Sequence, residues 1–238
     1  MVHPRCNTLL AQLPDADFEH LLPHLQLISL SAGDRLYNAG DPIGKIHFPV
    51  TALIALTREL SDGTRIDTAL LGSDEMLGLR GLLGDSSMHS VHVAASGLAY
   101  QLPLSVIQQA IASRHAVYRM CMQGGNDILN HISVETACAH FHCTEQRLAR
   151  WLLTRQDLLG SSHIEATHKR IAESLGVRRE AITLACRKLG GIESRHGQIE
   201  LLDRTPLEQM SCDCYFRQRE NRTARKTPSA ATLATSLR

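Results

Sequence analysis

Hydrophobic and polar positions follow two different patterns along the chain. Between residues 27 and 104, short apolar or alternating runs are separated by Gly–Asp turns. Short strands that recur about every ten residues between such turns are typical of a β-sandwich or a barrel-like roll. The expected strands are 28–30, 46–48, 53–56, 66–71, 91–95 and 99–102. Before them, apolar residues at helical spacing predict a short amphipathic helix over 15–25.

The pattern becomes helical after Pro103. Apolar residues then recur at spacings of three and four. The expected helices are 104–112, 116–141, 144–159 and two more within 167–189. A short β-hairpin is expected over 192–203, with its turn at His196-Gly197. The segment 217–238 lacks apolar periodicity and is rich in Arg, Lys, Thr, Ser and Ala, so it is expected to be a disordered basic tail.

The long helix expected over 116–141 carries a stripe that is partly polar. Its members are Val117, Met120, Gly124, Asp127, His131, Val134, Cys138 and Phe141. Two interpretations stay open: the stripe packs against the helix's own domain, or it pairs two subunits, which is the favoured one. The Gly124-Gly125 pair costs about 1 kcal/mol per glycine relative to alanine in a helix, so it indicates a kink or the close approach of another backbone.

Composition narrows the protein class. The chain has 238 residues, of which 43% are hydrophobic, 21% charged and 4% aromatic. These values are typical of a globular chain with an aliphatic core and exclude whole-chain disorder. No apolar run is long enough to span a membrane. No signal peptide is evident, and the seven cysteines are odd in number, so we expect a cytoplasmic protein without a disulfide framework.

Charge is divided unevenly along the chain. The net charge is only +1. Residues 1–139 hold 8 Lys and Arg against 13 Asp and Glu, a net of −5, whereas residues 140–238 hold 17 against 11, a net of +6. A basic half suggests contact with a polyanion, although basic tails also serve only as solvated surface.

The most specific motif lies at 167–185. Counted from His168, a small residue (Ala172) stands at position 5, Gly176 at position 9 and Ile182 at position 15. This spacing is typical of a helix-turn-helix, in which the small residue lets the helices cross closely and the glycine allows the turn. The second helix begins with Arg178, Arg179 and Glu180, where its first residues would face base edges.

These side chains suit particular parts of DNA. Arginine can bind guanine bidentately and glutamate can accept from cytosine, which favours Arg178, Arg179 and Glu180 as base readers. Thr167 and Lys169 lie where phosphates are expected. The hairpin after the motif would form a wing near the DNA backbone. The candidate DNA-binding residues are therefore Thr167, Lys169, Arg178, Arg179, Glu180, Thr183 and Arg195.

A β-roll, a long central helix and a winged helix-turn-helix in that order resemble the Crp/Fnr family of bacterial transcription regulators. The matching segments are 32–41 in the roll, 145–152 at the start of the DNA domain and 175–180 at the recognition helix. The resemblance implies an α+β fold and a homodimer joined through the central helices. It also implies a pseudopalindromic operator in double-stranded DNA, RNA polymerase as a partner and control by a small-molecule effector.

The resemblance also implies a domain order. We expect an effector-sensing β-roll over 1–113, a dimerisation helix over 114–141, a winged helix-turn-helix over 142–216 and the tail over 217–238. A ligand-sensing interaction protein that does not act through DNA is the alternative function. No enzyme motif is present, so we expect no catalytic activity. The operator, and the choice between activation and repression, stay open.

The candidate effector pocket departs from the cyclic-nucleotide members of the family. Those members have a glutamate for the ribose after the cassette glycine and an arginine for the cyclic phosphate. Here the corresponding residues are Gly78, Leu79, Arg80, His89 and Ser90. Since imidazole replaces a permanently charged guanidinium, cyclic AMP binding of the usual kind is not expected. The pocket could be empty, hold another molecule or be rebuilt around Arg80.

Other departures concern metal and the wing. Cys6 stands alone at the N-terminus, so an iron–sulfur cluster of the family's type is not expected. Cys138, His140, His142 and Cys143 are too close in sequence to converge tetrahedrally, since only positions 138 and 142 share a helical face. Cys212 and Cys214 form a second small group. No metal site is expected. Leu184 stands where relatives have a polar base reader, and the connection after Leu189 is about three residues shorter than usual.

Overall fold

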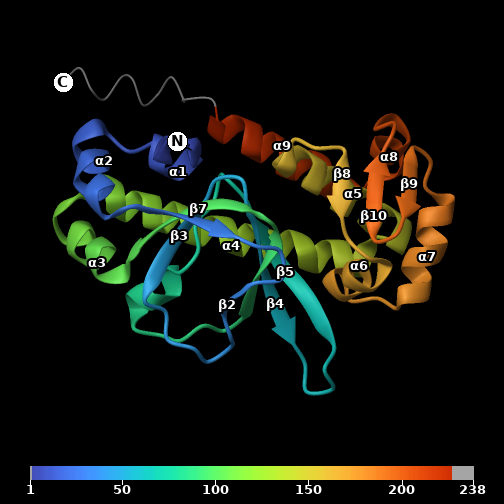
Figure 1. Cartoon of the computed structure of the whole chain (residues 1–238), viewed down its shortest axis with the longest axis horizontal. Helices are drawn as coiled ribbons and strands as arrows, with labels where there is room; N and C mark the ends of the chain where they lie inside the picture. Colours follow the sequence, from blue (N-terminus) through green and yellow to red (C-terminus); the bar gives the residue numbers. More distant parts are fainter. Residues whose placement is uncertain (1, 227–238) are drawn as a thin grey trace.

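A computed structural model describes residues 2–226. An N-terminal β-roll capped by short helices lies at one end, and a C-terminal helical domain with a small sheet lies at the other (Figure 1). The long helix α4 crosses between them (Figure 1). The chain thus has the mixed α+β architecture expected from the sequence, with sheets first and a helix-turn-helix last.

Short helices cover one end of the roll. They are the 3₁₀ turn η1 (Pro4–Cys6), α1 (Thr8–Ala11), α2 (Asp15–Leu21) and the 3₁₀ turn η2 (Leu22–His24). The expected helix over 15–25 therefore ends at Leu21 and continues as a 3₁₀ turn. Asn7 is fully buried, and its Nδ2 donates to the carbonyls of Pro49 and Glu75 at 2.9 Å each. This side chain ties the N-terminal helices to the roll.

Two antiparallel sheets build the roll. The strands are β1 (Gln26–Leu30), β2 (Arg35–Tyr37), β3 (Lys45–Pro49), β4 (Leu53–Glu59), β5 (Arg65–Leu71), β6 (Ser90–Ala95) and β7 (Gly97–Pro103). They pair in the orders β1-β7-β3 and β2-β6-β4-β5. The six expected strands are all present. Strand β2 and the 3₁₀ turn η3 (Leu79–Leu83) were not expected. Aliphatic side chains such as Ile54, Leu71 and Val93 fill the space between the sheets.

Helix α3 (Leu104–Ser113) leads into α4 (His115–Phe141), close to the expected bounds. Helix α4 passes through Gly124 without a break, and a Cβ there would lie 2.8 Å from Cγ of Met76. Close packing, and not a kink, therefore explains the glycine. A Cβ on Gly125 would meet open space.

The expected pairing stripe on α4 is largely a packing face of its own chain. Its buried members are Val117, Met120, Gly124, Asp127, His131 and Cys138. The exposed apolar side chains Tyr118, Met122 and Leu129 follow a different face, at spacings of four and seven. The interpretation of these six residues as a subunit contact is wrong, because they are buried within their own chain. The sequence did not indicate this, since the segments that cover them are distant along the chain.

Two residues, His142 and Cys143, separate α4 from the first helix of the C-terminal domain. Its elements are α5 (Thr144–Leu159), β8 (His163–Glu165), α6 (His168–Leu175), α7 (Arg179–Lys188), β9 (Ile192–Arg195), β10 (Gln198–Leu201), α8 (Thr205–Met210) and α9 (Asp213–Lys226). The sheet order is β8-β10-β9, so the expected hairpin gains a third strand. Leu148, Ile171, Ile182 and Tyr215 meet in one apolar core.

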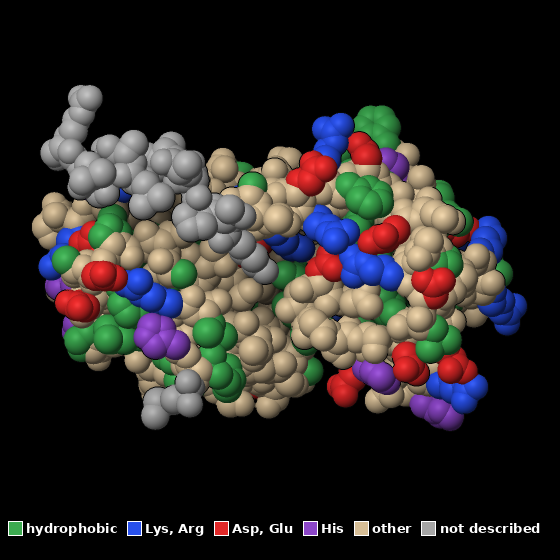
Figure 2. Space-filling view, turned by 90° about the horizontal axis from the view of Figure 1, so that it is seen from above, with side chains coloured by type: hydrophobic (Ala, Val, Ile, Leu, Met, Phe, Trp, Pro, Cys, Tyr) green, Lys and Arg blue, Asp and Glu red, His purple; other side chains and the backbone are tan. Residues whose placement is uncertain are grey.

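Helix α9 corrects the expected disordered tail. Residues 217–226 are helical, and 227–238 lie outside the described residues. Helix α9 carries cationic and polar side chains that meet acidic partners far away in sequence, so local composition gave no indication of its order. It runs back from the C-terminal domain toward the roll (Figure 1). Seen from above, Lys/Arg and Asp/Glu side chains lie next to each other on the surface of the C-terminal domain (Figure 2). Arg219 of α9 pairs with Glu208 of α8 at 3.4 Å.

Beneath α9 lies a cluster of buried charges. Asp74 and Glu75, each 1% exposed, follow β5, and His131 of α4 contacts Glu75 at 2.6 Å. Arg222 of α9 lies 3.4 Å from Asp74 and 4.0 Å from Glu75, and Arg225 pairs with Asp127. The cations of α9 therefore compensate the carboxylates that the roll and α4 bury.

A second polar contact joins the roll to the helix-turn-helix. We name Thr57, Asp67, His92 and Arg170 the domain junction. Arg170 of α6 donates to Asp67 Oδ2 at 2.9 Å and to Nε2 of His92. The Thr57 hydroxyl donates to Asp67 at 2.7 Å, so it is free to accept from Nδ1 of His92 at 3.0 Å. These contacts require a neutral His92 with its proton on Nδ1.

The domain junction predicts a loss of stability in mild acid. Burial, and then the charge of Arg170, lower the pKa of His92 to about 4 from 6.5. Because the pKa of His92 is lower in the folded chain than in the unfolded chain, the unfolded chain binds the proton first as the pH falls. The stability that neutral His92 contributes is therefore complete above pH 6.5 and is lost as the pH falls toward 4. Because His92 is partly exposed, solvent screens part of this effect. We expect the free energy of unfolding to fall by about 1 kcal/mol between pH 7 and pH 5. Urea unfolding of wild type and His92→Gln at several pH values measures it. The two pH slopes should differ, and identical slopes would contradict the assignment.

Candidate nucleic-acid interface

The motif at 167–185 forms a helix-turn-helix from α6 and α7. Ala172 and Ile182 are buried between the two helices, 4% and 0% exposed. Gly176 ends α6 with φ of 62°, and the N–H of Val177 donates to the carbonyl of Ala172 at 3.0 Å. Each marked position of the sequence pattern thus has the packing or turn role that its spacing predicted.

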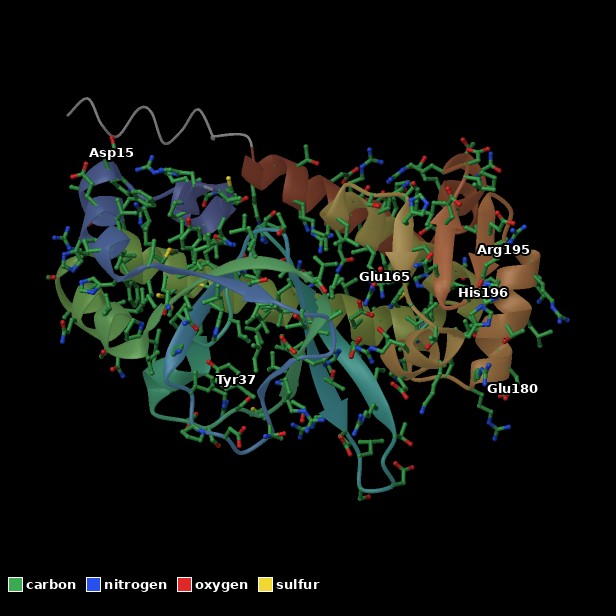
Figure 3. All side chains as sticks on the ribbon, viewed as in Figure 1. Asp15, Tyr37, Glu165, Glu180, Arg195 and His196 are labelled. Atoms are coloured by element: carbon green, nitrogen blue, oxygen red, sulfur yellow. The ribbon has the colours of Figure 1, made fainter. Side chains whose placement is uncertain are left out.

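The start of α7 presents charged side chains to solvent. Arg178 is the extended N-cap residue, and Arg179 and Glu180 form the first turn; all three are exposed. Glu180 projects outward at the far end of the molecule (Figure 3). Leu184, 55% exposed, follows one turn later on the same helix. The exposed start of α7 therefore offers two guanidinium groups and one carboxylate next to an apolar side chain.

The phosphate candidates lie at the start of α6. Thr167 is its N-cap and accepts from the N–H of Arg170 at 3.1 Å, so its hydroxyl proton stays available. The side chain of Lys169 is 78% exposed, and Glu173 is 4.0 Å away. Both side chains can meet a phosphate without losing a buried partner.

His168 organises the helix-turn-helix, a role that the sequence did not reveal. Its Nδ1 lies 3.1 Å from Oγ1 of Thr183, and its Nε2 lies 3.0 Å from Oγ of Ser194 in β9. Thr183 also donates to the carbonyl of Arg179 at 3.2 Å. The structure therefore places Thr183 where it supports the first turn of α7. Arg170, also not identified from the sequence, faces the domain junction instead of solvent.

The wing is the β9–β10 hairpin. His196 and Gly197 form its turn with φ of 49° and 83°. Arg195 pairs with Glu193, and its side chain is 75% exposed. Both Arg195 and His196 lie on the hairpin beside α7 (Figure 3). The side chains at the tip are therefore accessible to a ligand that also contacts α7.

The shortened connection into the wing depends on Gly191. This residue has φ of 76°, and a Cβ on it would lie 2.2 Å from the carbonyl oxygen of Asp203. Helix α7 ends at Lys188, and β9 starts at Ile192. The connection is closed by N–H groups of Leu202 and Asp203 that donate to the carbonyl of Gly191.

A Gly191→Ala change should therefore destabilise the protein. A backbone clash and an unfavourable φ together should cost at least about 2 kcal/mol, which corresponds to a fall in Tm of about 4–8 °C for a chain of this size. Gly190→Ala is the matched control, because its Cβ would meet only the ring of Pro206, 3.3 Å from Cβ and 3.7 Å from Cγ. Calorimetry of both variants provides the measurement. Equal Tm values for Gly191→Ala and wild type would show that the connection adjusts freely.

The effector candidates lie around η3 and the start of β6. Gly78 is the left-handed cap of η3, and a Cβ there would lie 2.4 Å from the carbonyl of Lys45. Arg80 is held by its own loop, with Asp85 at 2.9 Å and the carbonyl of Ser86 at 3.0 Å. Leu79 packs against the core below the N-terminal helices.

His89 does not supply the charge of the missing arginine. Burial, followed by the charges of Arg58 and Arg80, lowers its pKa, so the ring is neutral at neutral pH. Ser90 pairs with Thr57 at the start of β6. With Arg80 engaged by Asp85, the candidate residues do not form the carboxylate and free guanidinium that a cyclic nucleotide of the usual kind requires.

The cysteine and histidine residues have a different grouping from that considered in the sequence. Cys138 and His142 share one face of α4, as helical geometry predicted, and they meet Cys212 and Cys214 at the start of α9. His140 instead contacts the carbonyl of Thr136. Cys143 is exposed. These cysteines and histidines were expected to form two separate groups, because nothing in the sequence indicates that α9 returns to α4.

Among the described residues, no helix has both the length and the hydrophobicity needed to cross a bilayer.

Two family models match the chain. One is the cyclic nucleotide-binding domain over residues 27–114, and the other is the Crp-like helix-turn-helix domain over residues 146–210.

Known proteins show the same arrangement. A global nitrogen regulator from Synechococcus elongatus is 24% identical over 170 residues, which cover 67% of this chain and 76% of the relative. A solved transcriptional regulator of the Crp/Fnr family from Eubacterium rectale matches with a TM-score of 0.69 at 18% identity, over 87% of this chain and 98% of the other. The c-di-GMP responsive global regulator CLP from Xanthomonas campestris matches with a TM-score of 0.67 at 16% identity, over 80% and 100%.

Proposed function

The chain belongs to the Crp/Fnr family of transcription regulators, whose members are not enzymes, and it carries the family's helix-turn-helix DNA-binding domain; on this premise we propose that it binds a specific operator through α7. The observation that carries the proposal is the exposed run of Arg178, Arg179 and Glu180 at the start of that helix. Arg179 and Glu180 read bases, and Arg178 and Arg195 contact the edges of the site. Thr167 and Lys169 hold phosphates, while Thr183 supports the recognition helix.

The active form in this proposal is a homodimer joined along α4. Tyr118, Met122 and Leu129 are 44%, 53% and 65% exposed on one face of the helix. The open backbone at Gly125 lies on the same face, since the spacings are four, three and four. Burial of these side chains against a second copy would bring two α7 helices onto one pseudopalindromic operator.

In this proposal the roll over 1–113 senses a signal, the segment 114–141 that contains α4 transmits it, and 142–216 reads DNA. Because His89 is neutral and Arg80 is engaged, the signal is not cyclic AMP bound in the usual way. We place the protein in the cytoplasm, with RNA polymerase as its partner when it acts as an activator.

Selection of genomic DNA fragments by the purified full-length protein tests the proposal. We expect enrichment of one palindromic motif, and binding that weakens steeply with salt because phosphate contacts release counterions. Selection with and without a metabolite extract shows whether the roll needs a ligand. Retention of no DNA at low salt, together with a thermal shift caused by the extract, would favour a ligand-sensing interaction protein instead.

A further inference from the structure

Four potential metal ligands converge where α4 ends and α9 begins. They are Cys138, His142, Cys212 and Cys214, and one ligand atom from each lies within 4.8 Å of all the others. Cys138 and Cys212 are 0% and 3% exposed, whereas the other two are partly exposed. We propose that these four side chains form a structural zinc site that joins the end of α4 to the start of α9.

The distances within the group fit a tetrahedral zinc ion. Sulfur atoms bound to one zinc at about 2.3 Å are about 3.8 Å apart when the geometry is tetrahedral. Sγ of Cys138 lies 3.7 Å from Sγ of Cys212, and Sγ of Cys214 lies 3.8 Å from Nδ1 of His142. The remaining separations, up to 4.8 Å, need movements of about 1 Å to close around the ion.

The backbone supplies the ligands as two pairs. Cys138 and His142 are four residues apart at the end of α4, so they project from one face. Cys212 and Cys214 flank Asp213 at the first turn of α9. Three thiolates and one imidazole are a donor set that zinc uses in closed structural sites, since all four positions are filled by protein.

The surroundings are suited to the ion and its ligands. Asp213 Oδ1 lies 3.7 Å from Nε2 of His142, so the carboxylate can orient the ring while Nδ1 faces the thiols. Zinc with three thiolates carries one negative charge. The guanidinium of Arg150, 4% exposed, pairs with Glu135 and also interacts electrostatically with Cys138 and Cys212. Its Nε is buried and has no hydrogen-bond partner among the described residues, which leaves a donor available for a thiolate.

A disulfide accounts for less of this arrangement. A Cys138–Cys212 bond would shorten the 3.7 Å contact to about 2 Å. It would leave Cys214 and His142 side by side without a role, whereas a zinc ion uses all four side chains. The convergence of a nitrogen donor and a third sulfur therefore favours a metal ion.

Metal analysis of the full-length protein, purified with reductant and without added metal, tests the site. We expect one zinc per chain by mass spectrometry. After removal of zinc by a chelator, titration with Co²⁺ should give the visible absorption of a tetrahedral cobalt–thiolate centre. Cys212→Ser and His142→Ala should abolish this absorption, and His142→Cys should restore a four-ligand site. Asp213→Ala should weaken Co²⁺ binding about 10-fold or more.

Cys143→Ser is the matched control, because Cys143 is exposed next to His142 but lies outside the group. It should keep full zinc content. Circular dichroism of each variant confirms that loss of metal is not loss of folding. Zinc-free protein that also fails to bind Co²⁺ would overturn the proposal, as would iron with labile sulfide or a Cys138–Cys212 disulfide in the purified chain.

The site also predicts a link to DNA binding, and this link rests on the proposed function. The ion would fix α9 at the junction between α4 and the DNA-binding domain. Chelation should therefore weaken operator binding by wild type but not by metal-free Cys212→Ser. Zinc content and Co²⁺ absorption are measured without DNA, so failure of the zinc site and failure of the DNA-binding proposal can be told apart.

Discussion

Replacement of Arg179 by alanine should remove most of the sequence preference of the protein while leaving its non-specific DNA affinity nearly unchanged. The guanidinium is exposed in the first turn of α7, where it can bind O6 and N7 of a guanine bidentately. A bidentate pair contributes about 1–3 kcal/mol of discrimination, or about five- to 150-fold in the ratio of specific to non-specific Kd for each half-site. Competition binding between the selected operator and random DNA measures this ratio.

Lys169→Ala is the control for Arg179→Ala. Lys169 lies at the start of α6 with its side chain 78% exposed, so its loss should weaken all sequences equally. It should also reduce the slope of log K against log salt by about one. If Arg179→Ala kept the full ratio of specific to non-specific Kd, the assignment of Arg179 as a base reader would be wrong.

The second large effect concerns stability. Arg222→Ala should lower the free energy of unfolding by about 3–5 kcal/mol, because it leaves Asp74 and Glu75 buried without their shared cation. Both carboxylates are 1% exposed, and the side chain of Arg222 is 14% exposed. Denaturant unfolding at pH 7 measures the loss. Arg217→Ala is the matched control on the same helix, since its side chain is 78% exposed.

The effect of Arg222→Ala should depend on pH in a defined direction. Burial, followed by the charge of Glu75, raises the pKa of Asp74 to about 6 from 3.8. Because the pKa of Asp74 is higher in the folded chain than in the unfolded chain, its contribution to stability is complete below the unfolded pKa. This contribution is lost as the pH rises through the folded pKa of about 6. Removal of Arg222 should raise this pKa further. The penalty of the variant should therefore shrink toward pH 4, where Asp74 is protonated. An equal penalty at both pH values would indicate lost packing instead of lost charge.

The helix-turn-helix could be predicted because its information is local. The positions of Ala172, Gly176 and Ile182 are set by a turn and a helix crossing that any such motif needs, and the structure has them in those roles. The strands of the roll were recognised for a similar reason, since their alternation and their turns lie next to each other in sequence.

Contacts between distant segments could not be predicted in this way. Asp127 and His131 interrupt the stripe on α4 with polar groups that are stable only because Glu75 and Arg225 meet them. The same holds for α9, whose order depends on partners in the roll, and for the thiols at its start. No period in the sequence indicates that a C-terminal segment returns over a helix that ends more than 70 residues earlier.

The position of α9 has a consequence for synthesis of the protein. A chain emerges from the ribosome with its N-terminal part first, and domains generally fold in that order. Asp74, Glu75 and Asp127 are made early, whereas Arg222 and Arg225, the cations that pair with them, are near the end of the described chain. The nascent roll must therefore keep these carboxylates protonated or hydrated until translation is nearly complete. A ribosome that stalls before α9 would leave a regulator with exposed acid groups and an unfinished core, in the state most accessible to proteases.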